Sequence, residues 1–87
     1  MKYILDGNNM LSRASAHEEL ARVLEFPAYY GKNLDALWDM ISAMDAEVVL
    51  VNASAMLEAL DEYGSQLLET LQEANKTTRG FRFRIVE

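Results

Sequence analysis

Stretches of apolar and polar residues predict three strands separated by helical segments. Residues 48–51 (VVLV) are continuously apolar, which is typical of a strand covered on both faces or central in a parallel sheet. Residues 3–5 (YIL) form a shorter β-type run that ends at the turn signal of residues 6–9 (DGNN). Residues 81–85 (FRFRI) alternate apolar side chains with arginines, so they predict a half-buried strand with its arginines facing outward.

Two helices are predicted between the first and the second strand. Ser15 and Glu18 match the S-x-x-E capping box at the start of the first helix, and Pro27 ends that helix. Asn33 is the expected N-cap of the second helix, because its side chain can accept a hydrogen bond from a free backbone N–H of the first turn. The apolar positions at helical spacing in the first helix are Ala16, Leu20, Val23 and Leu24.

Two more helices are predicted between the second and the third strand. Ser54 is the expected cap of a short helix that runs to Leu60, and a longer helix follows from about Glu62. The positions that this longer helix is expected to bury are Leu67, Leu68, Leu71 and Ala74. The order β-α-α-β-α-α-β favours a parallel sheet with right-handed crossovers. The prediction is a single two-layer α/β domain, residues 1–87, with a three-stranded parallel sheet packed against helices.

The helix after Asn33 has an unusual outer face. At about 100° per residue, Asp35, Asp39 and Ser42 fall on the side opposite the apolar stripe, and Trp38 lies on the border between the two sides. Two carboxylates one turn apart destabilise an isolated helix, and only Asp35 is close enough to the helix N-terminus to be stabilised by it. The stripe expected to be buried is Leu34, Leu37, Ile41 and Met44.

The charge distribution favours a basic partner. The 87 residues carry a net charge of −6, and residues 33–75 contain nine carboxylates but neither lysine nor arginine. Phosphate neutralisation dominates nucleic-acid affinity, so this part of the chain would repel nucleic acid and attract a basic protein. A solubilising acidic surface explains the same charges. Composition and charge alone leave both interpretations open.

The sequence predicts neither a metal site nor a cofactor site. It contains no cysteine, and its only histidine, His17, cannot form an H-E-x-x-H motif and is expected to be solvated on its helix. Residues 6–9 are similar to the start of a calcium loop, but the glycine is misplaced and the twelfth position is not a glutamate. The scattered glycines form no phosphate-binding loop. No segment has the length of a signal-peptide core or of a membrane span, so a cytoplasmic protein is expected.

Catalysis is not expected either, although Asp35 and Asp39 could in principle form an acid–base pair. Both carboxylates are predicted to project from an exposed helical face, with no nucleophile or metal beside them. Among the aromatic residues, Tyr30 is expected in the core. For Tyr29 and Trp38 the sequence permits both a place at the core edge and a place in an interface, where aromatic side chains are enriched.

The segment from Pro27 to Asp39, P-x-Y-Y-G-x-N-L-D-A-L-W-D, resembles the signature of the barstar family of intracellular ribonuclease inhibitors. The similarity in element pattern extends over the whole chain. The resemblance implies a three-stranded parallel sheet packed against helices, and a loop and second helix that plug the active site of a basic, extracellular-type ribonuclease similar to barnase. The family pattern continues with glycine and tryptophan where this chain has Ala43 and Met44.

The resemblance also implies roles for individual residues. Asp39 would take the place of a substrate phosphate, Asp35 would pair with basic side chains at the guanine side, and Tyr29 would pack on the catalytic histidine of the enzyme. Glu73 would add a peripheral charge pair. The expected partner-binding residues are Tyr29, Gly31, Asn33, Leu34, Asp35, Trp38, Asp39, Ser42 and Glu73. The alternative is a barstar-like acidic module that binds another basic protein.

Overall fold

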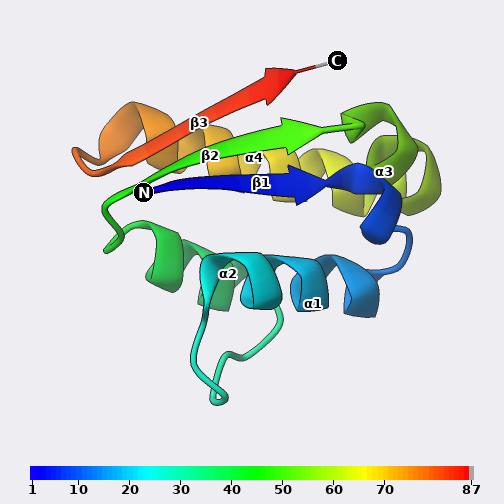
Figure 1. Cartoon of the computed structure of the whole chain (residues 1–87). Coiled ribbons are helices and arrows are strands. Elements are labelled where there is room, and N and C mark those ends of the chain that lie inside the picture. Colours follow the sequence, from blue (N-terminus) through cyan, green and yellow to red (C-terminus); the bar gives the residue numbers. More distant parts are fainter. Residues whose placement is uncertain (87) are drawn as a thin grey trace.

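Three parallel strands form one sheet in the order β1-β2-β3 (Figure 1). They are β1 (Lys2–Asp6), β2 (Ala46–Val51) and β3 (Phe81–Val86). The structure, a computed structural model, describes residues 1–86. The continuously apolar segment lies in the central strand, as predicted, and only Glu47 among its six residues is exposed.

Four α-helices connect the strands in the predicted order β-α-α-β-α-α-β. They are α1 (Arg13–Leu24), α2 (Leu34–Ile41), α3 (Ala53–Leu60) and α4 (Glu62–Thr77), and a short 3₁₀ helix, η1 (Gly7–Asn9), follows β1. The sheet forms one layer and the helices form the other (Figure 1). The loop between α1 and α2 extends away from the sheet, at the bottom of Figure 1. The predicted two-layer α/β class is confirmed.

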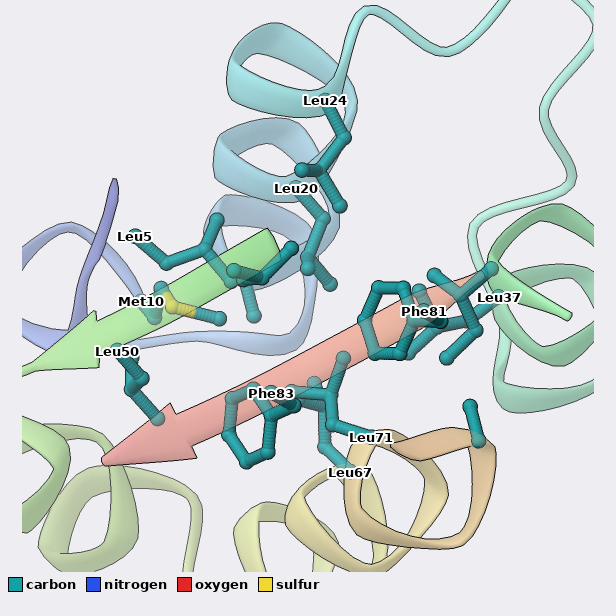
Figure 2. Close-up of a cluster of buried hydrophobic side chains, with 14 of the residues drawn as sticks. Leu5, Met10, Leu20, Leu24, Leu37, Leu50, Leu67, Leu71, Phe81 and Phe83 are labelled. Carbon is teal, nitrogen blue, oxygen red and sulfur yellow. The ribbon is translucent and has the colours of Figure 1, made fainter. Parts of the chain in front are cut away.

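The core lies between the sheet and the helices (Figure 2). Phe81 and Phe83 from β3, Leu50 from β2, and Leu67 and Leu71 from α4 all belong to this core. On the opposite face of β3, Arg82 and Arg84 are exposed, which confirms the outward arginines predicted by the alternation. Other fully buried side chains of the core are Leu5, Met10, Leu20, Leu37, Ile41 and Met56.

Two predicted helix caps were wrong. Helix α1 is capped by Ser12: Ser12 Oγ accepts a hydrogen bond from Ser15 N–H (3.0 Å), and Ser15 Oγ accepts one from Ser12 N–H (2.9 Å). The helix starts earlier than predicted because Ser15 takes the role that glutamate usually has in a capping box. The N-cap position of helix α3 is Asn52, which has a left-handed conformation (φ 55°) and makes no side-chain capping hydrogen bond, so Ser54 lies inside the first turn.

The buried stripe of α2 is shorter than predicted. Leu37 and Ile41 are fully buried, and Leu34 is half-buried. Helix α2 ends at Ile41, so Met44 lies beyond it and is also half-buried. Elsewhere, Val23 of α1 and Leu68 of α4 are half-buried at the margin of the core.

The carboxyl ends of β1 and β2 are held together by polar contacts. Asp6 Oδ1 accepts hydrogen bonds from Asn8 N–H and from the side-chain amide of Asn52, each at 2.9 Å, and the Asn52 bond is the largest cause of a lowered pKa at Asp6. A Cβ atom at Gly7 would collide with the carbonyl of Asn52. The predicted turn is therefore a structural junction at which position 7 permits only glycine.

Candidate functional site

The segment between α1 and α2, residues 25–33, carries several of the predicted partner-binding residues, and this candidate segment is called the binding loop below. It leaves α1 through Glu25 in a left-handed conformation (φ 59°). Tyr30 is 5% exposed, packs its ring on Phe26 at 4.7 Å, and donates its backbone N–H to Pro27 O at 3.0 Å. The neighbouring Tyr29 is 82% exposed. The core position predicted for Tyr30 is confirmed, and of the two alternatives for Tyr29 the structure places it in solvent.

The end of the binding loop is shaped by Asn33. Its Oδ1 accepts a hydrogen bond from Ala36 N–H at 2.7 Å, which confirms the predicted N-cap. Its Nδ2 is 3.4 Å from Gly31 O, and a Cβ on Gly31 would lie 3.2 Å from Cβ of Ala36. Asn33 and Gly31 therefore hold the loop close against the first turn of α2. The side chain of Asn33 is used within the chain and is less available to a partner than the sequence suggested.

Helix α2 presents two exposed carboxylates, Asp35 and Asp39, one turn apart on its outer side. Among residues 1–86, the ion pairs join Arg22 to Glu19 and Arg84 to Glu47, so neither aspartate has a cationic partner in the described chain. Ser42 is half-buried at the C-cap of α2. The predicted acidic face therefore exists, and its charges are not used inside the molecule.

A groove of about 620 Å³ separates α2 from α4. Leu34, Asp35 and Trp38 line it from α2, and Glu73 lies on the α4 side. Both Leu34 and Trp38 are half-buried, so each packs against the core and still reaches the groove. The structure thus brings Glu73 to the predicted surface of α2. Sequence reasoning missed the remaining groove residues of α4, which are Gln66, Glu69, Thr70, Gln72 and Lys76.

These missed residues carry a signal that the sequence contains. Gln66, Glu69 and Glu73 follow one another at spacings of three and four residues, which places them on one side of α4. Once Glu73 is placed at the surface, Glu69 belongs to the same stripe. The groove is therefore lined by three carboxylates, from Asp35, Glu69 and Glu73, and by the cation of Lys76.

The prediction of a solvated His17 was wrong. Its side chain is 1% exposed and lies between two tyrosine hydroxyls, with Nδ1 2.7 Å from Tyr30 Oη and Nε2 2.6 Å from Tyr63 Oη. Burial lowers the pKa of His17, and the nearby cation of Lys32 lowers it further. Burial raises the pKa of Tyr30 well above its ordinary range. Tyr63 is 46 residues away in the chain, so no local pattern could reveal this contact.

The described residues 1–86 contain no cluster of three or more His, Cys, Asp or Glu side chains suited to a metal ion. Within the same residues, every helix is too short or too polar to cross a membrane. The chemically distinctive surface is thus the exposed tyrosine of the binding loop together with the carboxylates of α2 and α4. Its groups suit recognition of a basic surface by charge and aromatic contact.

Fold and surface together define a small, acidic, two-layer α/β domain of the barstar-like class. The chain belongs to the barstar family: the family model described as "Barstar (barnase inhibitor)" matches residues 1–87. It is also 35% identical over 88 residues to a protein of Bacillus subtilis (strain 168) named "Putative ribonuclease inhibitor YrdF". That alignment covers 98% of this chain and 96% of the relative.

Proposed function

We propose that this protein inhibits a basic, barnase-like ribonuclease by covering its active site with the binding loop and α2. Membership of the barstar family and the name of the Bacillus subtilis relative support a ribonuclease as the target. The observation that carries the proposal is the pair Asp35 and Asp39, exposed one turn apart and without an ion pair in the described chain. Such a pair destabilises the free helix slightly, so it is best explained by a partner.

The proposed mechanism is mimicry of the RNA backbone. A ribonuclease must be basic where it holds phosphates, and Asp39 would occupy a phosphate position among those basic groups. Asp35 would pair with cations beside it, and Glu73 would reach the same partner from across the groove. Tyr29, 82% exposed, would contribute an aromatic contact at the loop end of the surface.

Five of the predicted partner-binding residues have a supporting part in this proposal. Gly31 and Asn33 hold the loop in shape through contacts within the chain. Ser42, at the C-cap of α2, would lie at the far end of the contact. Leu34 and Trp38 would supply apolar area at the groove. Beyond Ser42 the chain has an exposed Ala43 and a half-buried Met44 where the family pattern has glycine and tryptophan, so this end lacks the flat aromatic contact of that pattern.

The acidic surface would also guide association. The net charge is −6, so a basic enzyme is attracted from a distance before contact forms. The protein would be needed in the cytoplasm, where an extracellular-type ribonuclease must be kept inactive before export. Binding of another basic protein is the alternative, and an immobilised sample tests it: lysate is applied at low salt, and the proteins eluted at high salt are identified.

The decisive test is inhibition of RNA cleavage by a purified barnase-type ribonuclease, with wild type, Asp39→Ala and Glu58→Ala. Glu58 is an exposed carboxylate on α3, so Glu58→Ala removes the same charge outside the proposed surface. Asp39→Ala would leave basic groups of the enzyme buried and unpaired. Losing one partner of a buried ion pair costs about 3–5 kcal/mol, so inhibition should weaken by about a hundredfold to several thousandfold.

The Glu58→Ala control defines the result that would refute the mechanism. Glu58→Ala should inhibit within a few fold of wild type, since only long-range attraction changes. If Asp39→Ala inhibits as well as Glu58→Ala does, Asp39 takes no phosphate position and the proposed mechanism is wrong.

A further inference from the structure

A chain of side chains links α4 through α1 to the binding loop. The guanidinium of Arg13 lies 4.3 Å from the centre of the Tyr63 ring, which is a cation–π contact. The Tyr63 hydroxyl meets Nε2 of His17, and Nδ1 of His17 meets the hydroxyl of Tyr30. Because these four residues come from α1, α4 and the loop, the contacts join three separate parts of the chain.

The hydrogen bonds to Tyr30 and Tyr63 determine which ring nitrogen of His17 carries the proton. Tyr30 is buried, and its hydroxyl has no hydrogen-bond partner other than His17 within the described residues. Its proton is satisfied only if it donates to Nδ1, which leaves the ring proton on Nε2 to donate to Tyr63. Tyr63 is partly exposed, so water can accept its own hydroxyl proton. In this arrangement, with neutral His17, the hydroxyl protons of Tyr30 and Tyr63 and the ring proton of His17 each have an acceptor.

The bond from His17 determines where Tyr30 sits, and Tyr30 lies in the middle of the binding loop. On one side of it, Tyr29 is exposed, and on the other, Gly31 packs towards α2. Loops with few buried anchors are mobile, and the ring of Tyr30 is the most deeply buried side chain of this one. A displaced Tyr30 therefore displaces the exposed tyrosine that precedes it.

We propose that Tyr63 and His17 are positioning residues of the binding surface. They hold Tyr30 in place, so the loop presents Tyr29 and Gly31 in the geometry that the ribonuclease binds. This inference rests on the proposed function. It adds that a hydrogen bond outside the contact surface, from α4, controls the strength of inhibition, because a preorganised loop loses less conformational entropy on binding.

Protonation of His17 reverses the hydrogen bond to Tyr30, because Nδ1–H then donates to the hydroxyl oxygen. With protons on both ring nitrogens, Tyr30 can no longer donate to Nδ1, and its buried hydroxyl proton has no acceptor. The groups that face the ring are Tyr30 and Lys32 from the loop, Tyr63 from α4, and Arg13, which reaches it across the Tyr63 ring from α1. None of them is an anion, so nothing in this set compensates a positive charge on the imidazole.

The test compares Tyr63→Phe with Tyr3→Phe, since each variant loses one tyrosine hydroxyl. The hydroxyl of Tyr3, on β1, makes no hydrogen bond within the described residues. Hydrogen exchange of the free proteins reports on the loop without any ribonuclease: the Tyr30 amide, bonded to Pro27 O, should exchange faster in Tyr63→Phe than in Tyr3→Phe. Dissociation from the inhibited ribonuclease should be at least about fivefold faster in Tyr63→Phe, the effect of one lost hydrogen bond.

Each combination of results decides the question. Faster loop exchange with faster dissociation supports the proposal. Exchange equal to that of Tyr3→Phe overturns it, as does faster exchange with unchanged dissociation. If wild type inhibits no ribonuclease, the proposed function fails, and the exchange data still show whether Tyr63 holds the loop.

The pH profile provides a second measurement on the wild type, in case Tyr63→Phe folds poorly. Dissociation of the wild-type complex should accelerate once the pH falls below the pKa of the folded-state His17, which burial lowers from the ordinary value of a histidine. His17→Gln, which has no titrating ring, should lack this acceleration. Equal pH profiles for the two proteins would overturn the proposal.

Discussion

Leu37 and Tyr29 test whether the buried and exposed sides of the binding segment have been assigned correctly. Leu37 is fully buried beneath α2, and Tyr29 is 82% exposed in the binding loop. Truncating a buried leucine to alanine costs about 2–5 kcal/mol, because apolar contacts are lost and a cavity remains. A surface substitution usually changes stability by less than about 0.5 kcal/mol. The two alanine variants should therefore differ in stability by at least about 1.5 kcal/mol.

This difference is large compared with the total free energy of unfolding expected for the domain, so it is easy to measure. At about 0.05–0.15 kcal/mol per residue, a chain of 87 residues has a free energy of unfolding of about 4–13 kcal/mol. Leu37→Ala thus removes a large share of it, and for a domain of this size the Tm should fall by at least about 8 °C. Tyr29→Ala should leave the Tm almost unchanged and should weaken inhibition of the ribonuclease.

Urea unfolding followed by far-UV circular dichroism gives the free energies, and an RNA-cleavage assay gives the inhibition. A loss of more than about 1 kcal/mol in Tyr29→Ala would mean that Tyr29 is a core residue. A fully active and stable Leu37→Ala would mean that α2 does not pack through this side. Either result would refute the assignment of faces.

Three further predictions concern charge. Burial lowers the pKa of His17, so below pH 6.5 the unfolded chain binds more protons than the folded one. The free energy of unfolding should therefore fall as the pH drops through that value, by up to about 1.4 kcal/mol per pH unit. His17→Gln should remove this contribution to the slope in urea titrations. Asp39→Ala should leave the free protein as stable as wild type or slightly more stable, because it removes a like-charge pair with Asp35 worth about 0.2–0.5 kcal/mol; a clear destabilisation would show a structural role. The association rate with the ribonuclease should fall steeply with added salt, since charges are screened beyond about 10 Å at 0.1 M ionic strength. Association rates that stay the same across salt concentrations in stopped-flow measurements would contradict electrostatic attraction before contact.

Much of the fold could be predicted from local patterns. The apolar run at residues 48–51 identified the central strand, and the alternation at residues 81–85 identified a strand with one exposed face. Asn33 marked the start of α2 because a cap acts on an N–H only three residues away. Such signals depend on neighbours in sequence, so they can be read without a structure. The acidic side of α2 followed from helical geometry in the same way.

The errors arose where several local signals competed. Ser12, Ser15 and Ser54 can each cap a helix, and the backbone geometry around them decides which one does. Asn52 takes the N-cap position of α3 without a side-chain capping bond, because its side chain donates instead to Asp6 at the end of the neighbouring strand. A capping motif covers only neighbouring residues, so it cannot predict a contact with a residue 46 positions away in the chain.

Tertiary structure alone decided the environment of His17 and the groove beside α2. A single histidine on a helix reads as solvated, and only the packing of α4 and the binding loop against α1 buries it between two tyrosines. Likewise, Asp35 and Glu73 line one groove because two helices pack side by side, not because of any spacing along the chain. Sequence periodicity specifies which side of an element is buried, whereas the identity of the side chains that meet there depends on the packing of elements distant in the chain.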